Sequence, residues 1–147
     1  MSTRCRIAYC FDEKSSIPSS YCHYDGYIEG VGLALLDKYN DKHNAFYLAS
    51  AGDFRSLIHS KMNDEGYYET RTVEELEHFS DFHLPAIHDD FDALIKDFED
   101  SDQEFLYVYF EKADCWKVFA NKWDKVKQDF FVEYLGDLEH CVKNLKA

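Results

Sequence analysis

Two stretches near the start of the chain alternate apolar and polar side chains, as half-buried strands do. They run over residues 3–11 and 17–23, and a turn-forming segment begins between them at Asp12. This pattern predicts a β-hairpin. Residues 105–110 and 116–119 alternate in the same way around a short polar turn, with apolar side chains on both faces, and predict a second, more central hairpin.

Other stretches show the spacing of helices. Apolar residues recur at helical intervals over residues 31–39, and a second short helix is expected over residues 41–50. Thr72 and Glu75 have the spacing of a capping box, which predicts that another helix begins there.

A helix with one apolar stripe is expected on each side of the second hairpin. The first carries Phe91, Leu94, Ile95 and Phe98, and Pro85 separates it from the helix that begins at Thr72. The second closes the chain, and its stripe consists of Phe131, Tyr134, Leu135, Leu138, Val142 and Leu145. Two hairpins with helices grouped between and after them indicate an α+β fold, with an antiparallel sheet of about four strands covered by helices.

The length of 147 residues suits a single domain spanning residues 1–147. No apolar run approaches the length of a membrane span, and the N-terminal residues lack the features of a secretory signal, so we expect a cytoplasmic protein. The five cysteines are odd in number and form no Cys-x-x-Cys pair, which favours reduced thiols and neither a disulfide framework nor a zinc site.

The charge of the chain is concentrated in one acidic segment, at about residues 64–104, which the apolar spacing predicts to be helical. This segment carries fifteen carboxylates and two cations, which accounts for the whole formal net charge of −13. A surface of this sign repels DNA, so direct binding to nucleic acid is disfavoured despite the lysines of residues 117–127.

The stretch YCHYDGYIEGVG, residues 21–32, is the strongest candidate for chemistry. Cys22 and His23 are neighbours on an expected strand, so their side chains point to opposite faces and do not form a nucleophile–base pair. The glycines match neither a dinucleotide fingerprint nor a P-loop and are better explained by a tight strand-to-helix junction. His78, His83 and His88 recur every five residues, which does not place them on one helical face. We therefore expect no enzyme activity, no cofactor and no metal.

The longer stretch SSYCHYDGYIEGVGLALLDKYN resembles the N-terminal signature of a group of small, mostly uncharacterised phage-encoded proteins. The resemblance extends to AGDFRSL at residues 51–57 and, loosely, to the aromatic strands near residues 105–118. The acidic segment and the closing helix have no counterpart in that group. The resemblance implies a phage origin, and with it the host cytoplasm as the place of action, but it implies no activity.

Origin and charge together suggest an anti-defence protein. Regularly spaced carboxylates can occupy a groove built for phosphates, so the expected partner is a host nucleic-acid-binding protein such as a CRISPR effector, a restriction enzyme or a recombination nuclease. The expected partner-binding residues are Glu74, Glu75, Glu77, Asp81, Asp89, Asp90, Asp92, Asp97, Glu99, Asp100 and Asp102. One alternative is a solvated acidic face that only maintains solubility. Another is a protein-binding module or virion component acting through apolar contacts, with Tyr24, Asp25 and Tyr27 as a secondary contact. The last is a small enzyme using Cys22 and His23.

Overall fold

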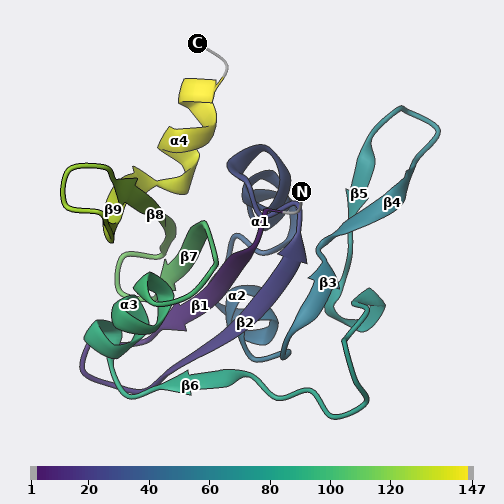
Figure 1. Ribbon diagram of the computed structural model, residues 1–147. Coiled ribbons are helices and arrows are strands. Elements are labelled where there is room, and N and C mark those ends of the chain that lie inside the picture. The colour runs from purple at the N-terminus through teal and green to yellow at the C-terminus, as the bar shows by residue number, and fades with distance from the viewer. Residues whose placement is uncertain (1–2, 146–147) are drawn as a thin grey trace.

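A mixed sheet of seven strands forms the centre of the protein, in a computed structural model that describes residues 3–145 (Figure 1). Its order is β3-β2-β1-β7-β8-β9, and β6 also pairs with β2. The strands are β1 (Cys5–Cys10), β2 (Ile17–Tyr24), β3 (Phe54–Ser56), β6 (Ala86–His88), β7 (Phe105–Phe110), β8 (Cys115–Asp124) and β9 (Asp129–Asp137). A separate two-stranded sheet consists of β4 (Ile58–Met62) and β5 (Tyr68–Thr70).

The α+β class and both predicted hairpins are confirmed, but the four-stranded antiparallel sheet is wrong. β1 pairs antiparallel with β2, and β7 pairs antiparallel with β8. The two hairpins meet through β1 and β7, which run parallel from Cys5 opposite Phe105 to Cys10 opposite Phe110. Alternation of apolar and polar side chains along a strand indicates which face is buried, but it does not indicate which strand lies beside it. The sequence therefore does not predict this pairing.

Helices cover both faces of the sheet. One face is packed by the π-helical turn η1 (Ile28–Gly32), by α1 (Leu33–Lys38), by α2 (Lys42–Ala49) and by α4 (Leu138–Leu145). The other face is packed by α3 (Phe91–Glu99), whose Leu94 and Phe98 are fully buried against Leu106 and Val108. The stripe predicted for this helix is therefore confirmed, since Phe91 and Ile95 pack partly buried against the same cluster.

Two predicted helices are absent or shorter in the structure. The capping box at Thr72 is present, but it opens only the 3-10 turn η2 (Val73–Glu75), so the acidic segment 64–104 is mostly strand, turn and loop. The closing helix begins only at Leu138, because residues 129–137 form β9 and pair with β8. The aromatic residues of this stretch fit both periods, and β8 supplies partners for its backbone amides.

The junction between β2 and η1 confirms the structural interpretation of the glycines. Asp25 has a left-handed backbone with φ of 60°, and its carbonyl oxygen accepts from Val31 N at 2.9 Å. A Cβ atom at Gly30 would lie 2.3 Å from that carbonyl oxygen, and one at Gly26 would lie 2.8 Å from Cys5 Cβ. The chain turns from strand to helix here only because these side chains are missing.

Candidate functional site

The three motif residues proposed as a secondary contact line one groove of about 560 Å³. Tyr24 and Asp25 come from the end of β2, and Tyr27 from the turn before η1. β3, the β4–β5 hairpin and the start of the acidic segment form the remaining walls. The lining residues are Tyr24, Asp25, Tyr27, Arg55, Ser56, Ile58, His59, Ser60, Tyr68, Arg71 and Glu77.

Two stretches of the chain resemble the phage-encoded proteins, one before and one within residues 51–57. Parallel pairing of β2 with β3 brings them together near this groove. Tyr24 lies opposite Ser56, and Cys22 lies opposite Phe54. The backbone N–H of Tyr21 also donates to the carboxylate of Asp53 at 3.0 Å. Residues 24–27 and 55–56, which are far apart in sequence, thus form one wall of the groove.

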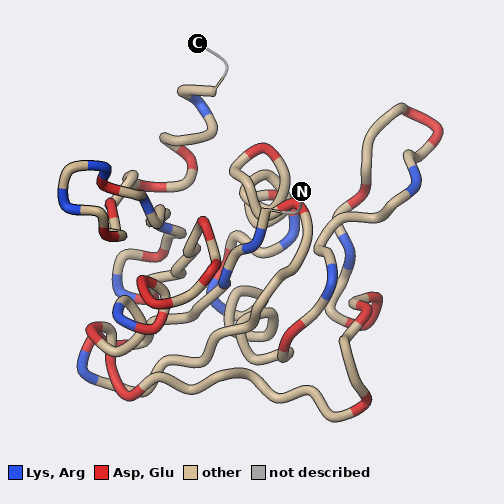
Figure 2. Tube along the Cα trace, in the orientation of Figure 1, with Lys and Arg blue, Asp and Glu red and all other residues tan. Residues whose placement is uncertain are grey.

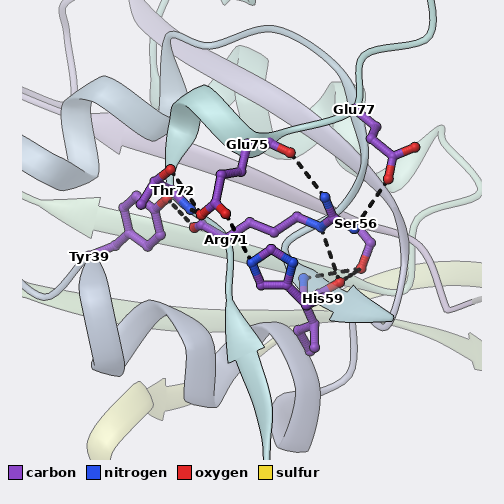
Figure 3. Close-up of polar contacts among 8 residues, drawn as sticks. Tyr39, Ser56, His59, Arg71, Thr72, Glu75 and Glu77 are labelled. Carbon is purple, nitrogen blue, oxygen red and sulfur yellow. Dashed lines mark hydrogen bonds and ion pairs between the residues drawn. The ribbon is translucent and has the colours of Figure 1, made fainter. Parts of the chain in front are cut away.

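Arg71 is the centre of the polar contacts on the other wall (Figure 3). Its guanidinium donates to the backbone oxygens of Ile58 at 3.3 Å and Glu75 at 3.0 Å, and it forms an ion pair with Glu77 at 3.1 Å. The hydroxyl of Tyr39 donates to the carbonyl oxygen of Arg71 at 2.7 Å. These contacts hold all three nitrogens of the guanidinium, so Arg71 fixes β4 to η2 and to the segment that follows it.

Glu75 has a structural role of its own in this cluster. Its carboxylate accepts from the backbone N–H of Thr72 at 2.9 Å and from the Thr72 hydroxyl at 3.1 Å, and it lies 3.2 Å from His59 Nε2. The backbone N–H of Thr72 and then its hydroxyl lower the pKa of Glu75. The negative charge of this side chain therefore stabilises the turn.

The aromatic residues of the groove remain available at the surface. Tyr24, Tyr27 and Tyr68 are exposed, and the hydroxyl of Tyr27 donates to the Asp25 carboxylate at 3.2 Å. Burial, and then the charge of Asp25, raises the pKa of Tyr27. The groove can thus offer flat apolar rings beside fixed polar groups, which is the composition of a protein contact.

Cys22 and His23 lie on opposite faces of β2, as the sequence predicts. Cys22 is fully buried and its thiol donates to the carbonyl oxygen of Tyr24 at 3.3 Å. His23 Nδ1 lies 2.7 Å from the hydroxyl of Tyr21, beside the ring of Phe79. The structure does not bring this cysteine and histidine together for catalysis.

Ser19, His88 and Asp97, which the sequence did not link to one another, come together in the structure. Ser19 Oγ lies 2.7 Å from His88 Nε2, and His88 Nδ1 lies 2.7 Å from a carboxylate oxygen of Asp97. Arg6 Nη1 also donates to Ser19 Oγ at 2.8 Å. No short motif joins residues separated by 69 positions, so the sequence gives no sign of this contact.

The order of burial is opposite to that of a serine hydrolase, in which the serine faces the substrate and the acid lies behind the histidine. Ser19 is fully buried, whereas the side chain of Asp97 is 61% exposed. A substrate has no access to this hydroxyl. The contact instead connects α3, through Asp97, to β6 and β2.

The expected partner-binding carboxylates divide into two groups (Figure 2). One group surrounds η2, where Val73 and Leu76 pack against the core on the side of α1 and α2. The other group belongs to α3 and its flanks, on the opposite face of the sheet. The first group is Glu74, Glu75 and Glu77, and the second is Asp89, Asp90, Asp92, Asp97, Glu99, Asp100 and Asp102, with Asp81 in the connection between them.

Many of these carboxylates already have partners. In the η2 group, Glu74 accepts from the hydroxyl of Tyr47 at 2.9 Å. In the α3 group, Asp90 accepts from Ala93 N at 2.8 Å as the N-cap, and Asp100 and Asp102 form ion pairs with Lys96 at 3.3 Å and Arg4 at 2.6 Å. Within residues 3–145, the side chains of Asp81, Asp89, Asp92 and Glu99 make no hydrogen bond or ion pair.

Two of the three evenly spaced histidines are neighbours, against expectation. The rings of His78 and His83 stack with centroids 3.5 Å apart, and each Nδ1 is within hydrogen-bond distance of a backbone oxygen, those of Asp53 and Ala51. The helical spacing argument fails because this stretch is an extended loop. His88 lies apart from them, in β6.

None of the helices within residues 3–145 has the length and apolar character needed to cross a membrane. Comparisons of the chain with protein-family models, with curated proteins and with solved structures find no match.

Proposed function

We propose that the chain is a phage-encoded anti-defence protein that binds a host nucleic-acid-handling protein and inhibits it. The contact surface is the outer face of α3 with its flanking residues. Seven of the expected carboxylates belong to this face, and the opposite side of the helix is anchored by Leu94 and Phe98. An acidic surface fixed in this way can compete with the phosphates of a nucleic acid for a basic groove.

The observation that carries the proposal is that some α3 carboxylates are bonded within the fold and others are not. Asp90 and Asp97 are used within the fold, as the N-cap and as the partner of His88. Asp89, Asp92 and Glu99 have no such use within residues 3–145, so their charges remain for a partner. A helix whose free charges are unnecessary for folding is consistent with selection for binding.

The test neutralises only the free charges, as Asp89→Asn, Asp92→Asn and Glu99→Gln in one protein. Its matched control is Asp64→Asn, Glu65→Gln and Glu69→Gln, which removes the same charge from the β4–β5 hairpin. Tagged wild-type protein should recover a nucleic-acid-handling protein from host extract, and double-stranded DNA should displace it. Since the proposed contact is electrostatic, the α3 variant should lose this binding and raised salt should weaken it, whereas the control should bind as the wild type does. Equal recovery by the α3 variant would refute the role of this face.

A second candidate is a mainly apolar protein contact at the groove. The exposed rings of Tyr24, Tyr27 and Tyr68 support it, because tyrosines contribute much binding energy at interfaces. Here Tyr24→Ala with Tyr27→Ala should abolish binding, and raised salt should leave it unchanged.

A further inference from the structure

The two edges of the sheet differ in the length of their edge strands. The end next to β2 consists of β3 and β6, which have three residues each. The other end is β9, which has nine residues and, within residues 3–145, pairs only with β8. Very short edge strands prevent unwanted pairing, whereas a long edge strand is a template for another strand.

Along this edge, backbone groups of β9 point away from β8. Phe130 N–H donates to the carboxylate of its neighbour Asp129 at 2.9 Å, so it does not bond to β8. Asn121 lies opposite Val132, yet its N–H donates to Glu104 O at 3.0 Å, on the side away from β9. Both observations identify the pairs at Phe130 and Val132 as non-hydrogen-bonded pairs. By alternation, the N–H and C=O groups of Phe130, Val132 and Tyr134 point outward.

The two faces of β9 differ in character. Phe130 packs on Trp123 with ring centroids 4.9 Å apart, and Tyr134 packs on Phe119 at 5.1 Å, so this face is aromatic. Its largest side chains remain partly open to solvent, with Trp123 51% and Tyr134 52% exposed. The opposite face alternates to Asp129, Phe131 and Glu133.

Every charged residue of β9 is negative, which favours a partner strand that carries cations. The charged residues are Asp129, Glu133 and Asp137, of which Asp137 already pairs with Lys117 at 2.9 Å. A second copy that paired antiparallel about Glu133 would place Glu133 opposite Glu133 and Asp129 opposite Asp137. Antiparallel pairing about Val132 would place Glu133 opposite Phe131 and Asp129 opposite Leu135, so neither carboxylate would gain a cation. In-register parallel pairing would align like charges as well, and like charges opposite one another destabilise a ladder.

We propose that the β9 edge adds one extended segment of a partner protein, in which apolar side chains alternate with lysine or arginine. The outward N–H and C=O groups of β9 bond the backbone of this segment. Its apolar side chains extend the aromatic face, and its cations lie beside Asp129 and Glu133. This surface is distinct from the outer face of α3 and does not depend on it.

The probe is a blocked nine-residue peptide in which valine alternates with lysine. One control peptide replaces each lysine by glutamate, and another is N-methylated at two adjacent central residues, which blocks both of its hydrogen-bonding edges. Both controls should bind at least about tenfold more weakly than the probe, because one lacks the charge match and the other the backbone bonds. Amide exchange at Phe130, Val132 and Tyr134 should slow when the probe is added.

Protein variants test the charge match. Glu133→Lys should weaken binding of the valine–lysine peptide and strengthen binding of the valine–glutamate peptide. Glu65→Lys, at an exposed turn, should change the affinity for neither peptide. The α3 variant should bind the probe like the wild type, which separates this proposal from the proposed function. The proposal fails if the N-methylated peptide binds as tightly as the probe, or if amide exchange slows elsewhere. It also fails if these three amides are protected without peptide in a concentration-dependent way, because a second copy would then be the occupant.

Discussion

The hydroxyl oxygen of Ser19 lies 2.7 Å from His88 Nε2 in a fully buried position between β2, β6 and α3. The same imidazole reaches Asp97 on α3, so a single side chain fixes the helix that carries the acidic face. The orientation of α3 therefore depends on one buried polar contact in addition to its apolar stripe.

His88→Ala should lower the free energy of unfolding by about 2–4 kcal/mol, because it leaves a cavity and a buried hydroxyl without one of its partners. Asp97→Asn should have a smaller effect, since an amide can still accept a hydrogen bond. Chemical denaturation measures both, with Asp92→Asn as the matched control on the same helix. If His88→Ala were as stable as that control, the contact would have no structural role.

Gly30→Ala should destabilise the protein by more than about 2 kcal/mol, because the new methyl group would overlap the carbonyl oxygen of Asp25. The exposed neighbour Glu29 provides the control as Glu29→Ala. Thermal unfolding of both variants would show the difference. Equal melting temperatures would mean that the junction relaxes without cost.

Tyr107→Phe, in β7, also tests the junction between β2 and η1. The buried hydroxyl of Tyr107 donates to the carbonyl oxygen of Gly26 at 2.7 Å, so its removal should cost about 1–3 kcal/mol by leaving that oxygen without a partner. Tyr67→Phe, at an exposed position on the β4–β5 turn, should change stability by less than about 0.5 kcal/mol. A denaturant titration that finds the two substitutions equal would contradict this role.

The contribution of Glu75 should depend on pH. Its pKa is lower in the folded state than in the unfolded state, so its stabilisation is present above the unfolded pKa of about 4.3 and is lost as pH falls through the folded pKa. Wild-type protein should therefore be more stable than Glu75→Gln at pH 7, and the difference should shrink at about pH 3. If the stability difference between the two proteins grew on acidification, the pKa of Glu75 would be raised in the folded state and not lowered.

All five cysteines should be reduced thiols, and denatured protein without reductant should titrate as five. Cys5 and Cys22 lie opposite each other on β1 and β2, so a count of three would indicate a disulfide between them. Burial, followed by nearby Glu13 and Asp12, raises the pKa of Cys10 to about 11. In native protein at pH 8, half-buried Cys115 and Cys141 should be alkylated before Cys10, which mass spectrometry can follow.

Local patterns in the sequence were sufficient for the parts of the fold that are decided locally. The β1–β2 and β7–β8 hairpins, α2 and α3 follow from alternation, periodicity and caps. The parallel pairing of β1 with β7 could not be predicted, because it joins residues about a hundred positions apart and neither strand records its neighbour. β9 was mistaken for a helix because its aromatic residues satisfy either period.

The candidate sites show the same limit. The opposite orientation of Cys22 and His23 follows from their adjacency on a strand. Ser19, His88 and Asp97 meet only because β6 pairs with β2 and α3 packs over both, and that arrangement is a property of the whole fold. The charge of the acidic segment was evident from composition, but its division between two faces of the sheet was not.

The parallel contact between β1 and β7 also determines how the chain can fold while it is being synthesised. The hydrogen-bonding edge of β1 that faces away from β2 has no partner until residues 105–110 have left the ribosome. During that interval the nascent chain exposes the apolar strand Cys5–Cys10, and closing the sheet requires a loop of nearly a hundred residues. Fragments that end before residue 105 should consequently aggregate or recruit chaperones, whereas the completed chain buries this strand at the centre of its sheet.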